Sequence, residues 1–257
     1  MFILNFLHIL FTSTMWVTLF LMHFIVAIIF SWFFRDSEYA NIKMAVFFIR
    51  IGMFFTGLKI KVDGLENIED LKTNFIVMAN HQSLMDILVL MQAIPKKFSF
   101  IAKKELFKIP VLGWDIAMQG HFYIDRKNPR VAVKQLKKIK EKAKKGASLL
   151  IFPEGTRSLD GEIGSFKRGA FLLAQEAELP IVPLYINGTD KIVKKHSLKM
   201  YPGEVIISIG KPIFMDDFKA AESKRNIDIE TLLKVTRDTM LELQNNVKKD
   251  IVPKKNV

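Results

Sequence analysis

The chain contains no cysteine, and this absence excludes several kinds of chemistry at once. Disulfide bonds, cysteine-ligated metal sites and a thiol nucleophile are all ruled out. No group of His, Asp and Glu has the spacing of metal ligands, so no metal is expected. The chain also lacks internal repeats and low-complexity tracts, which argues against a solenoid or a linker-rich protein.

Charge is missing from the first part of the chain, because Met1–Phe34 contains no Asp, Glu, Lys or Arg. A spanning helix needs about 20 apolar residues, and Met15–Phe34 satisfies that length. Met1–Phe11 is then expected to lie in the membrane interface or form a second short segment, separated by the polar cluster Thr12–Thr14. His8 and His23 are expected to be neutral and bonded within the helices. The run lacks the basic start and the cleavage site of a signal peptide.

A second apolar stretch, Asn41–Lys59, differs from the first because it carries charge. Arg50 in its middle makes a second membrane span costly, so a helix lying in the interface is the better interpretation. Lys and Arg begin at Arg35, so if the first segment spans the membrane, the positive-inside rule places the main domain in the cytoplasm. If the segment only dips into one leaflet, the domain lies on that side. We expect membrane-anchoring helices over residues 1–60 and a catalytic domain over residues 61–257.

Composition points to an anionic, lipid-rich environment. Of the 257 residues 50% are hydrophobic and 22 are Phe, and the formal net charge is +12, which favours anionic partners. Pro129–Lys145 is expected to be a helix whose exposed side is rich in lysine. That side is either simply solvated or attracts anionic lipid or an acidic carrier protein. Nucleic acid is not expected as a partner, because no nucleic-acid-binding module is recognisable.

Apolar runs alternate with helical patterns after Lys61–Thr73, which is expected to be a polar connection. This alternation predicts an α/β fold with a mixed, mainly parallel sheet flanked by helices. The expected strands are Phe75–Asn80, Phe98–Ala102, Phe122–Ile124, Ser148–Phe152, Ile181–Ile186 and Val205–Ile209. The expected helices are Leu84–Ala93, Glu105–Met118, Pro129–Lys145, Arg168–Glu178 and Ile229–Val247.

The stretch Asn80–Asp86 lies between an expected strand and an expected helix, where reactive groups of α/β proteins are commonly found. His81 precedes Asp86 by five residues, so a carboxylate can orient the imidazole and leave its other nitrogen free to take a proton. Ser83 is expected to cap the helix. The alternative for His81 is a hydrogen-bonded structural histidine.

Three further stretches stand out: Gly120–Arg126, Phe152–Ser158 and Ile181–Ile186. The first two of them, like Asn80–Asp86, place polar or charged residues at an expected strand exit or on the turn beyond it. Arg126 and Arg157 are guanidinium groups suited to binding a phosphate. Lys103 and Lys104 can add ammonium groups, and Gly155 allows backbone to approach a ligand. Glu154 can orient a substrate hydroxyl or hold the arginines. In the alternative, Asp125 pairs with Arg126, or Glu154 with Arg157.

These stretches resemble, in order, the four motifs of the glycerolipid acyltransferase family, and especially of bacterial 1-acyl-sn-glycerol-3-phosphate (lysophosphatidate) acyltransferases. Asn80-His81 through Asp86 is similar to the NHxSxxD-type first motif, and Gly120 through Arg126 is similar to the second. Phe152-Pro153-Glu154-Gly155-Thr156-Arg157-Ser158 is a full match to the third, and Ile181–Leu184 resembles the fourth. The resemblance covers roughly Leu58–Pro212.

The resemblance implies a glycerophosphate acyltransferase-like fold and a set of roles. His81 is implied as the general base and Asp86 as the residue that holds its imidazole. The implied ligands of the glycerophosphate are Lys103, Arg126, Glu154, Gly155, Thr156 and Arg157. Neither Pro183 nor His121 receives a chemical role. Ser83 is read as a cap, with a Ser83 acyl-enzyme as the alternative.

The implied reaction moves an acyl group from acyl-CoA or acyl carrier protein to lysophosphatidate, without a further cofactor. The implied location is the bacterial inner membrane, in contact with phospholipid and with the catalytic domain on the cytoplasmic side. Other acceptors remain open, namely glycerol 3-phosphate, an ornithine lipid or another lysophospholipid. Two other classes also remain: a non-catalytic module that binds anionic lipid, and a phosphate-ester hydrolase.

Overall fold

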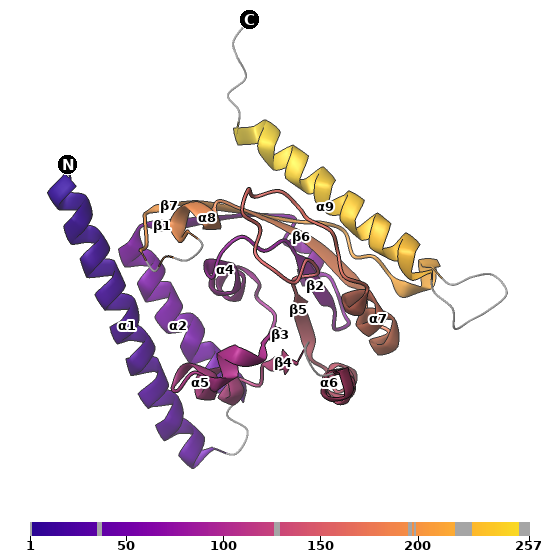
Figure 1. Cartoon of the computed structure of the whole chain (residues 1–257), viewed down its shortest axis with the longest axis horizontal. Coiled ribbons are helices and arrows are strands. Elements are labelled where there is room, and N and C mark those ends of the chain that lie inside the picture. Colours follow the sequence, from indigo (N-terminus) through magenta and orange to yellow (C-terminus); the bar gives the residue numbers. More distant parts are fainter. Residues whose placement is uncertain are drawn as a thin grey trace, which may run out of the picture.

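The computed structural model describes residues 2–34, 38–125, 129–194, 197, 199–218 and 228–251. A seven-stranded sheet with the order β1-β7-β6-β2-β5-β3-β4 runs through its middle (Figure 1). The strands are β1 (Leu58–Asp63), β2 (Ile76–Ala79), β3 (Phe98–Lys103), β4 (Phe122–Ile124), β5 (Ser148–Ile151), β6 (Ile181–Asn187) and β7 (Gly203–Ile209). All neighbouring strands pair in parallel except β6 and β7, which are antiparallel.

Helices cover both faces of the sheet. They are α1 (Phe2–Phe33), α2 (Glu38–Thr56), α3 (Glu66–Glu69), α4 (Met85–Ala93), α5 (Leu112–Met118), α6 (Pro129–Lys144), α7 (Arg168–Ala177), α8 (Thr189–Ile192) and α9 (Ile229–Ile251), with 3-10 turns η1 (Lys104–Lys108) and η2 (Met215–Phe218). One face packs against α2, α4 and α5, and the other against α6, α7 and α9 (Figure 1). This mixed sheet between helical layers is the predicted fold class.

The central strands are apolar along their whole length because both of their faces are covered. Every residue of β2 and β5 is buried, and so is all of β6 except Asn187. Such continuous apolar runs are typical of strands inside parallel sheets. The six strands predicted from these runs are confirmed, with ends that differ by no more than two residues.

Strand β1 was not predicted, because its residues were divided between a helix and a polar connection. In Leu58–Asp63 buried and exposed residues alternate, with Lys59 and Lys61 on the open side. Alternation with lysine on the outside is the pattern of an edge strand. Helix α2 ends earlier than expected, at Thr56, because Gly57 adopts φ +74° and stops it.

The N-terminal segment forms one helix, and the expected break at Thr12–Thr14 is wrong. Helix α1 runs without interruption from Phe2 to Phe33. The Thr12 hydroxyl donates to the carbonyl oxygen of His8 at 2.9 Å, so this polar group is satisfied inside the helix. Helices α1 and α2 lie side by side at one edge of the molecule (Figure 1).

The expected helix Glu105–Met118 is also wrong, because it is divided in two. Pro110 and Val111 separate η1 from α5, and Val111 has φ +66°, which a helix cannot contain. By contrast, α6 begins at Pro129 as predicted, and Gly146, with φ +105°, lies just beyond its last turn. Asn128, directly before α6, lies outside the described residues.

Two helices are long and apolar enough to cross a membrane: Phe6–Phe33 within α1, and α2. The apolar window of α1 is only 17% buried, so most of its surface faces outward. Helix α2 instead shares the core beneath the sheet through Ile42, Ala45 and Ile49. The division into residues 1–60 and 61–257 stays a prediction, and β1 starts at Leu58.

Candidate active site

The site begins where β2 ends and the chain turns into α4. Asn80 determines the direction of that exit, because its side chain pairs with the backbone of β6. Its Oδ1 accepts from the N–H of Ile186 at 2.7 Å, and its Nδ2 donates to the carbonyl oxygen of the same residue at 2.9 Å. The amide therefore extends the pairing of β2 with β6 by one position. The next residue, His81, then lies just beyond the carboxyl end of β2.

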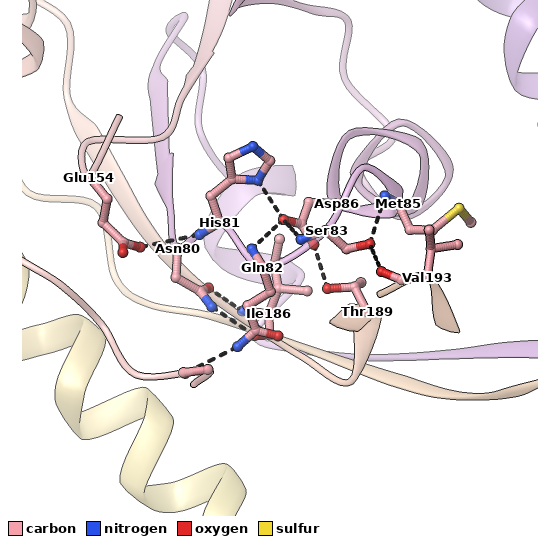
Figure 2. Close-up of polar contacts among 11 residues, drawn as sticks. Asn80, His81, Gln82, Ser83, Met85, Asp86, Glu154, Ile186, Thr189 and Val193 are labelled. Carbon is pink, nitrogen blue, oxygen red and sulfur yellow. Dashed lines mark hydrogen bonds and ion pairs between the residues drawn. The ribbon is translucent and has the colours of Figure 1, made fainter. Parts of the chain in front are cut away.

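His81 and Asp86 form a close pair, as predicted. The Nδ1 atom of His81 lies 2.7 Å from Oδ2 of Asp86 (Figure 2). The imidazole also stacks on Phe152, with ring centroids 4.1 Å apart and 15° between the planes. Because the carboxylate accepts a hydrogen bond from the protonated Nδ1, Nε2 is left free to accept a proton. The histidine side chain is 18% exposed, so its outer nitrogen can be reached by a substrate.

Asp86 is fully buried, and its carboxylate accepts hydrogen bonds from several donors. Its Oδ2 accepts from the backbone N–H groups of Gln82 at 2.7 Å and Ser83 at 2.9 Å, and its Oδ1 accepts from the Thr189 hydroxyl at 2.5 Å. Backbone donors of this kind stabilise the ionised carboxylate. The carboxylate thus has a fixed position and can keep the imidazole in one orientation.

Ser83 serves the local structure. Its hydroxyl oxygen accepts from the Met85 N–H in the first turn of α4 at 3.3 Å, although Leu84 and not Ser83 occupies the N-cap position, so the predicted cap is displaced by one residue. The hydroxyl donates to the carbonyl oxygen of Val193 at 2.7 Å, and the residue has no exposed surface. Because its proton points to a backbone oxygen, the geometry favours the capping role over that of a nucleophile.

The turn after β5 brings Glu154 against the histidine. One oxygen of its carboxylate accepts from the backbone N–H of His81 and the other from that of Gly164, each at 3.2 Å. Burial raises the pKa of Glu154, and these two hydrogen bonds oppose that rise. The carboxylate therefore braces the backbone on which His81 stands, while its predicted contact with substrate stays a prediction.

The same turn places the predicted phosphate ligands next to His81. Gly155 adopts φ +72°, a conformation that favours glycine and lets the turn close tightly. Thr156 is exposed and Arg157 is partly exposed. The next residue, Ser158, donates its backbone N–H to the carbonyl oxygen of His81 at 2.7 Å. This bond joins the first and third sequence motifs directly.

The remaining predicted ligands belong to strands farther along the sheet. Lys103 ends β3 and is exposed, and β5 separates β3 from the strand that leads to His81. Its neighbour Lys104 is engaged elsewhere, because Nζ lies 2.6 Å from Oδ2 of Asp125, whose charge raises the pKa of Lys104. Arg126 lies outside the described residues, and its assignment stays a prediction.

An apolar cavity of about 300 Å³ lies beside the site, between α1 and α2 on one side and α4 and α5 on the other. Leu84, three residues after His81, lines it together with Ile87 and Leu88 of α4. Pockets for small organic molecules have volumes from about 300 Å³ upward. The cavity can therefore hold an apolar group against α4, the helix that begins just after His81.

His121 is a core residue, as its lack of an assigned role implied. It stacks on Phe100 at 3.7 Å between ring centroids and is 7% exposed. Burial, aided by the charges of Lys142 and Lys97, lowers the pKa of His121 from 6.5 to about 3. The ring is therefore neutral at pH 7 and cannot act as a base under ordinary conditions.

This depressed pKa gives the protein an acid sensitivity. Between the folded value of about 3 and the unfolded value of 6.5, the unfolded chain binds more protons. The free energy of unfolding that depends on a neutral His121 is fully present above pH 6.5. It is lost progressively as the pH falls from 6.5 toward the folded pKa of about 3. Denaturant titrations in detergent should show that His121→Phe reduces the loss between pH 7 and pH 5.5 by about 1 kcal/mol. Equal losses in both proteins would contradict the buried, neutral histidine.

Several supporting residues were not predicted, because they come from distant segments. Thr189 and Val193 bond Asp86 and Ser83 from more than 100 positions away. Gly164 completes the contacts of Glu154. The only sequence signal for this region is the turn pair Asn187-Gly188 before Thr189, which marks a turn without indicating where it packs.

The chain belongs to the acyltransferase family, because the family model described as "Acyltransferase" matches residues 59–187. This range contains β2 to β6, all of β1 except Leu58, and the site residues His81, Asp86 and Glu154, but it ends before Thr189, which bonds Asp86.

The solved structure of the 1-acyl-sn-glycerophosphate (LPA) acyltransferase PlsC from Thermotoga maritima is similar to this chain over nearly its whole length. The TM-score is 0.76 with 28% sequence identity, and the match covers 94% of this chain and 97% of the other.

Curated relatives carry a related name, 1-acyl-sn-glycerol-3-phosphate acyltransferase. A chloroplastic protein of Arabidopsis thaliana is 44% identical over 156 residues, which cover 60% of this chain and 44% of the relative. A protein of Pseudomonas aeruginosa is 36% identical over 169 residues, which cover 65% and 63%. The chain thus spans between about half and two thirds of the length of these relatives.

Proposed function

We propose that this protein is a membrane-associated 1-acylglycerol-3-phosphate acyltransferase, which moves an acyl group from a thioester to the 2-hydroxyl of lysophosphatidate and forms phosphatidate. The observation that carries the proposal is the 2.7 Å contact between His81 and a buried Asp86, at a strand exit beside an apolar cavity. The names of the relatives support the choice of acceptor.

The proposed reaction uses Nε2 of His81, the imidazole nitrogen that Asp86 does not bond. Nε2 of His81 takes the proton of the lipid hydroxyl while the oxygen attacks the thioester carbonyl carbon. The tetrahedral intermediate then collapses, the carbon–sulfur bond breaks, and the leaving thiolate takes the proton from the imidazolium. Asp86 stabilises the imidazolium during the transfer. The substrate supplies the nucleophile, so no acyl-enzyme and no cofactor are needed.

The acceptor is held by its phosphate, at a distance from the reacting hydroxyl. Arg157 and the backbone around Gly155 lie on the turn that is bonded to His81 through Ser158. Lys103 contributes from the end of β3, and Arg126 is the further ligand implied by the second motif. A phosphate fixed there directs the hydroxyl toward Nε2. The arginines then accelerate the reaction by orienting the acceptor and not by stabilising charge on the reacting atoms. The apolar cavity accommodates an acyl chain.

Removal of the phosphate-binding guanidinium should weaken the binding of the acceptor selectively. We expect Arg157→Ala to raise KM for lysophosphatidate by about 10–100-fold, the value of a charge-assisted hydrogen bond, with a smaller effect on the donor. Steady-state kinetics with each substrate varied in turn measure this. Arg168→Ala is the control, because Arg168 pairs with Glu230 on the surface. A change confined to the KM of the donor would refute the assignment.

The membrane supplies the acceptor and takes up the product. Helix α1 contacts the rest of the protein at Trp16, which donates to Thr56 at 2.8 Å, and at His23, which lies 2.9 Å from Asp115. Contacts at both positions favour a helix that lies along the domain in one leaflet over one that crosses the bilayer. We place the catalytic domain on the cytoplasmic side of the bacterial inner membrane, where acyl thioesters are made.

The donor is acyl-CoA or acyl carrier protein, both of which are anionic. Helix α6 carries a row of exposed lysines that suits either partner or an anionic lipid surface: Lys134, Lys137, Lys138 and Lys144.

A comparison of two acceptors tests the proposed function. Purified protein in detergent receives an acyl thioester with lysophosphatidate or with glycerol 3-phosphate, and the lipid products are resolved by mass spectrometry. Phosphatidate from lysophosphatidate alone is the expected result. Acylation of glycerol 3-phosphate instead would assign another acceptor. Transfer to neither, with wild type equal to His81→Ala, would favour a non-catalytic lipid-binding protein.

A further inference from the structure

The segment Ile109–Trp114, which runs from the end of η1 into the first turn of α5, exposes large apolar side chains although it belongs to the catalytic domain. Ile109 is 45% exposed and Trp114 is 60% exposed. Pro110 between them is exposed as well, and Lys108 just before them is an exposed cation. Neither the acid–base pair nor the phosphate-binding turn uses these residues. An exposed apolar cluster of this kind marks a contact with a partner or with lipid.

The backbone holds the segment in one conformation. Val111 has φ +66° and ψ −60°, and the Leu112 N–H donates to the Pro110 carbonyl oxygen at 2.8 Å. This is a γ-turn with positive φ, a rare and strained arrangement for a β-branched residue. Gly113 packs so tightly that an added Cβ would lie 2.2 Å from the carbonyl oxygen of Phe107. The segment therefore has a single, well-packed backbone conformation.

Three contacts tie α5 to the second half of α1. Trp114 stacks on Phe24, with ring centroids 6.3 Å apart and 25° between the planes. One residue on, Asp115 lies 2.9 Å from the buried His23, and Gln119 holds the other carboxylate oxygen at 2.8 Å. Farther along, the Ser31 hydroxyl lies 3.9 Å from Sδ of Met118. Helix α5 is consequently fixed beside α1 (Figure 1).

The apolar surface of α1 continues on both sides of these contacts. Its exposed large apolar side chains from Leu21 onward are Leu21, Met22, Ile25, Val26, Ile28, Ile29, Trp32 and Phe33. Since α1 and α5 are tied together, a lipid surface that receives this half of α1 also meets Trp114. Tryptophan is favoured at the interface of a bilayer, and Lys108 can extend its ammonium group to the head groups.

We propose that Ile109–Trp114 inserts into the phospholipid surface as a contact of the catalytic domain, separate from the α1–α2 pair. The proposal rests on the membrane association put forward above. Leu112 and Ile116 of α5 line the same cavity as Leu84, which follows His81. The inserted segment therefore places the rim of the cavity at the level where a lipid acceptor resides, so the acceptor reaches the site without leaving the bilayer.

Fluorescence quenching tests the insertion directly. The chain has three tryptophans, so Trp16→Phe with Trp32→Phe leaves Trp114 as the sole emitter. The protein is added to anionic phospholipid vesicles whose acyl chains carry bromine, and emission is compared with unbrominated vesicles. Strong quenching of Trp114 is expected. The control has all three tryptophans replaced by Phe and carries Val235→Trp on α9, on the opposite face of the sheet, and should not be quenched.

The outcomes separate this proposal from the proposed function. Quenching of a sole Trp32 on α1 without quenching of a sole Trp114 would overturn the insertion and leave the anchor intact. Failure of the wild type to sediment with the vesicles would overturn both the anchor and the insertion. Acyl transfer is measured separately and does not enter the readout.

A second variant tests the consequence for access. Ile109→Ser with Trp114→Ser should lower partition into vesicles about tenfold or more, because two apolar side chains leave the lipid. Its apparent KM for lysophosphatidate embedded in vesicles should rise by a similar factor, while kcat in detergent micelles stays at the wild-type value. Equal loss in vesicles and micelles would indicate damage to the fold and contradict a role at the lipid surface.

Discussion

Replacing His81 by alanine should lower kcat by about 10²–10⁴-fold, the usual contribution of a general base. No other described group at this strand exit is placed to take over the proton, because the Asp86 carboxylate is buried and the Glu154 carboxylate bonds two backbone N–H groups. The measurement is the rate of phosphatidate formation at saturating substrates.

The variant must be shown to be folded, since His81 also stacks on Phe152. Circular dichroism and thermal unfolding in detergent provide that check. His8→Ala is the matched control, because it removes a histidine from α1, far along the chain from the site. A His81→Ala protein that retains wild-type turnover would remove the base from the mechanism.

Asp86→Asn should cost a similar factor in kcat and also lower stability. The amide nitrogen would face donors where the carboxylate now accepts from Gln82, Ser83 and Thr189. Each buried donor left without a partner costs about 1–3 kcal/mol. The imidazole would also lose the acceptor that holds its Nδ1 proton, so the tautomer with a free Nε2 would no longer be favoured.

A double mutant separates the two effects. If Asp86 acts only through His81, the activity of His81→Ala/Asp86→Asn should equal that of His81→Ala, although its stability is lower. Thr189→Val removes one of the hydrogen-bond donors to Asp86 and keeps the shape of the side chain. It should therefore show a smaller loss of activity and stability than Asp86→Asn. Additive losses of activity in the double mutant would show that the two residues act independently.

The fold could be predicted where strands are buried on both faces, because burial alone makes them continuous apolar runs. Strands β2, β5 and β6 are of this kind. Edge strand β1 was missed because one of its sides faces solvent and carries lysine. The division of Glu105–Met118 was missed although Pro110, which a helix interior disfavours, lies at the break; the positive φ of Val111 adds to the break and is not indicated by any residue preference.

The chemistry of the site could be predicted because it is local in sequence. His81 and Asp86 lie five residues apart, and the turn from Pro153 to Ser158 carries its own pattern. The residues that hold this chemistry in place are not local. Asn80 bonds Ile186, and Thr189 bonds Asp86, both through the pairing of β2 with β6. Such partners are defined by the arrangement of strands and not by spacing along the chain.

Direct transfer of the acyl group to the lipid hydroxyl can be tested by the release of thiol before any acceptor is present. The purified protein is mixed with an acyl thioester alone, and free thiol is followed from the first turnover; lysophosphatidate is added afterwards. If His81 is the base for the lipid hydroxyl, no burst of thiol equal to the enzyme concentration should appear before lysophosphatidate is added. Thiol should be released rapidly after the addition. A burst of one thiol per protein before the addition would show an acyl-enzyme and contradict the mechanism.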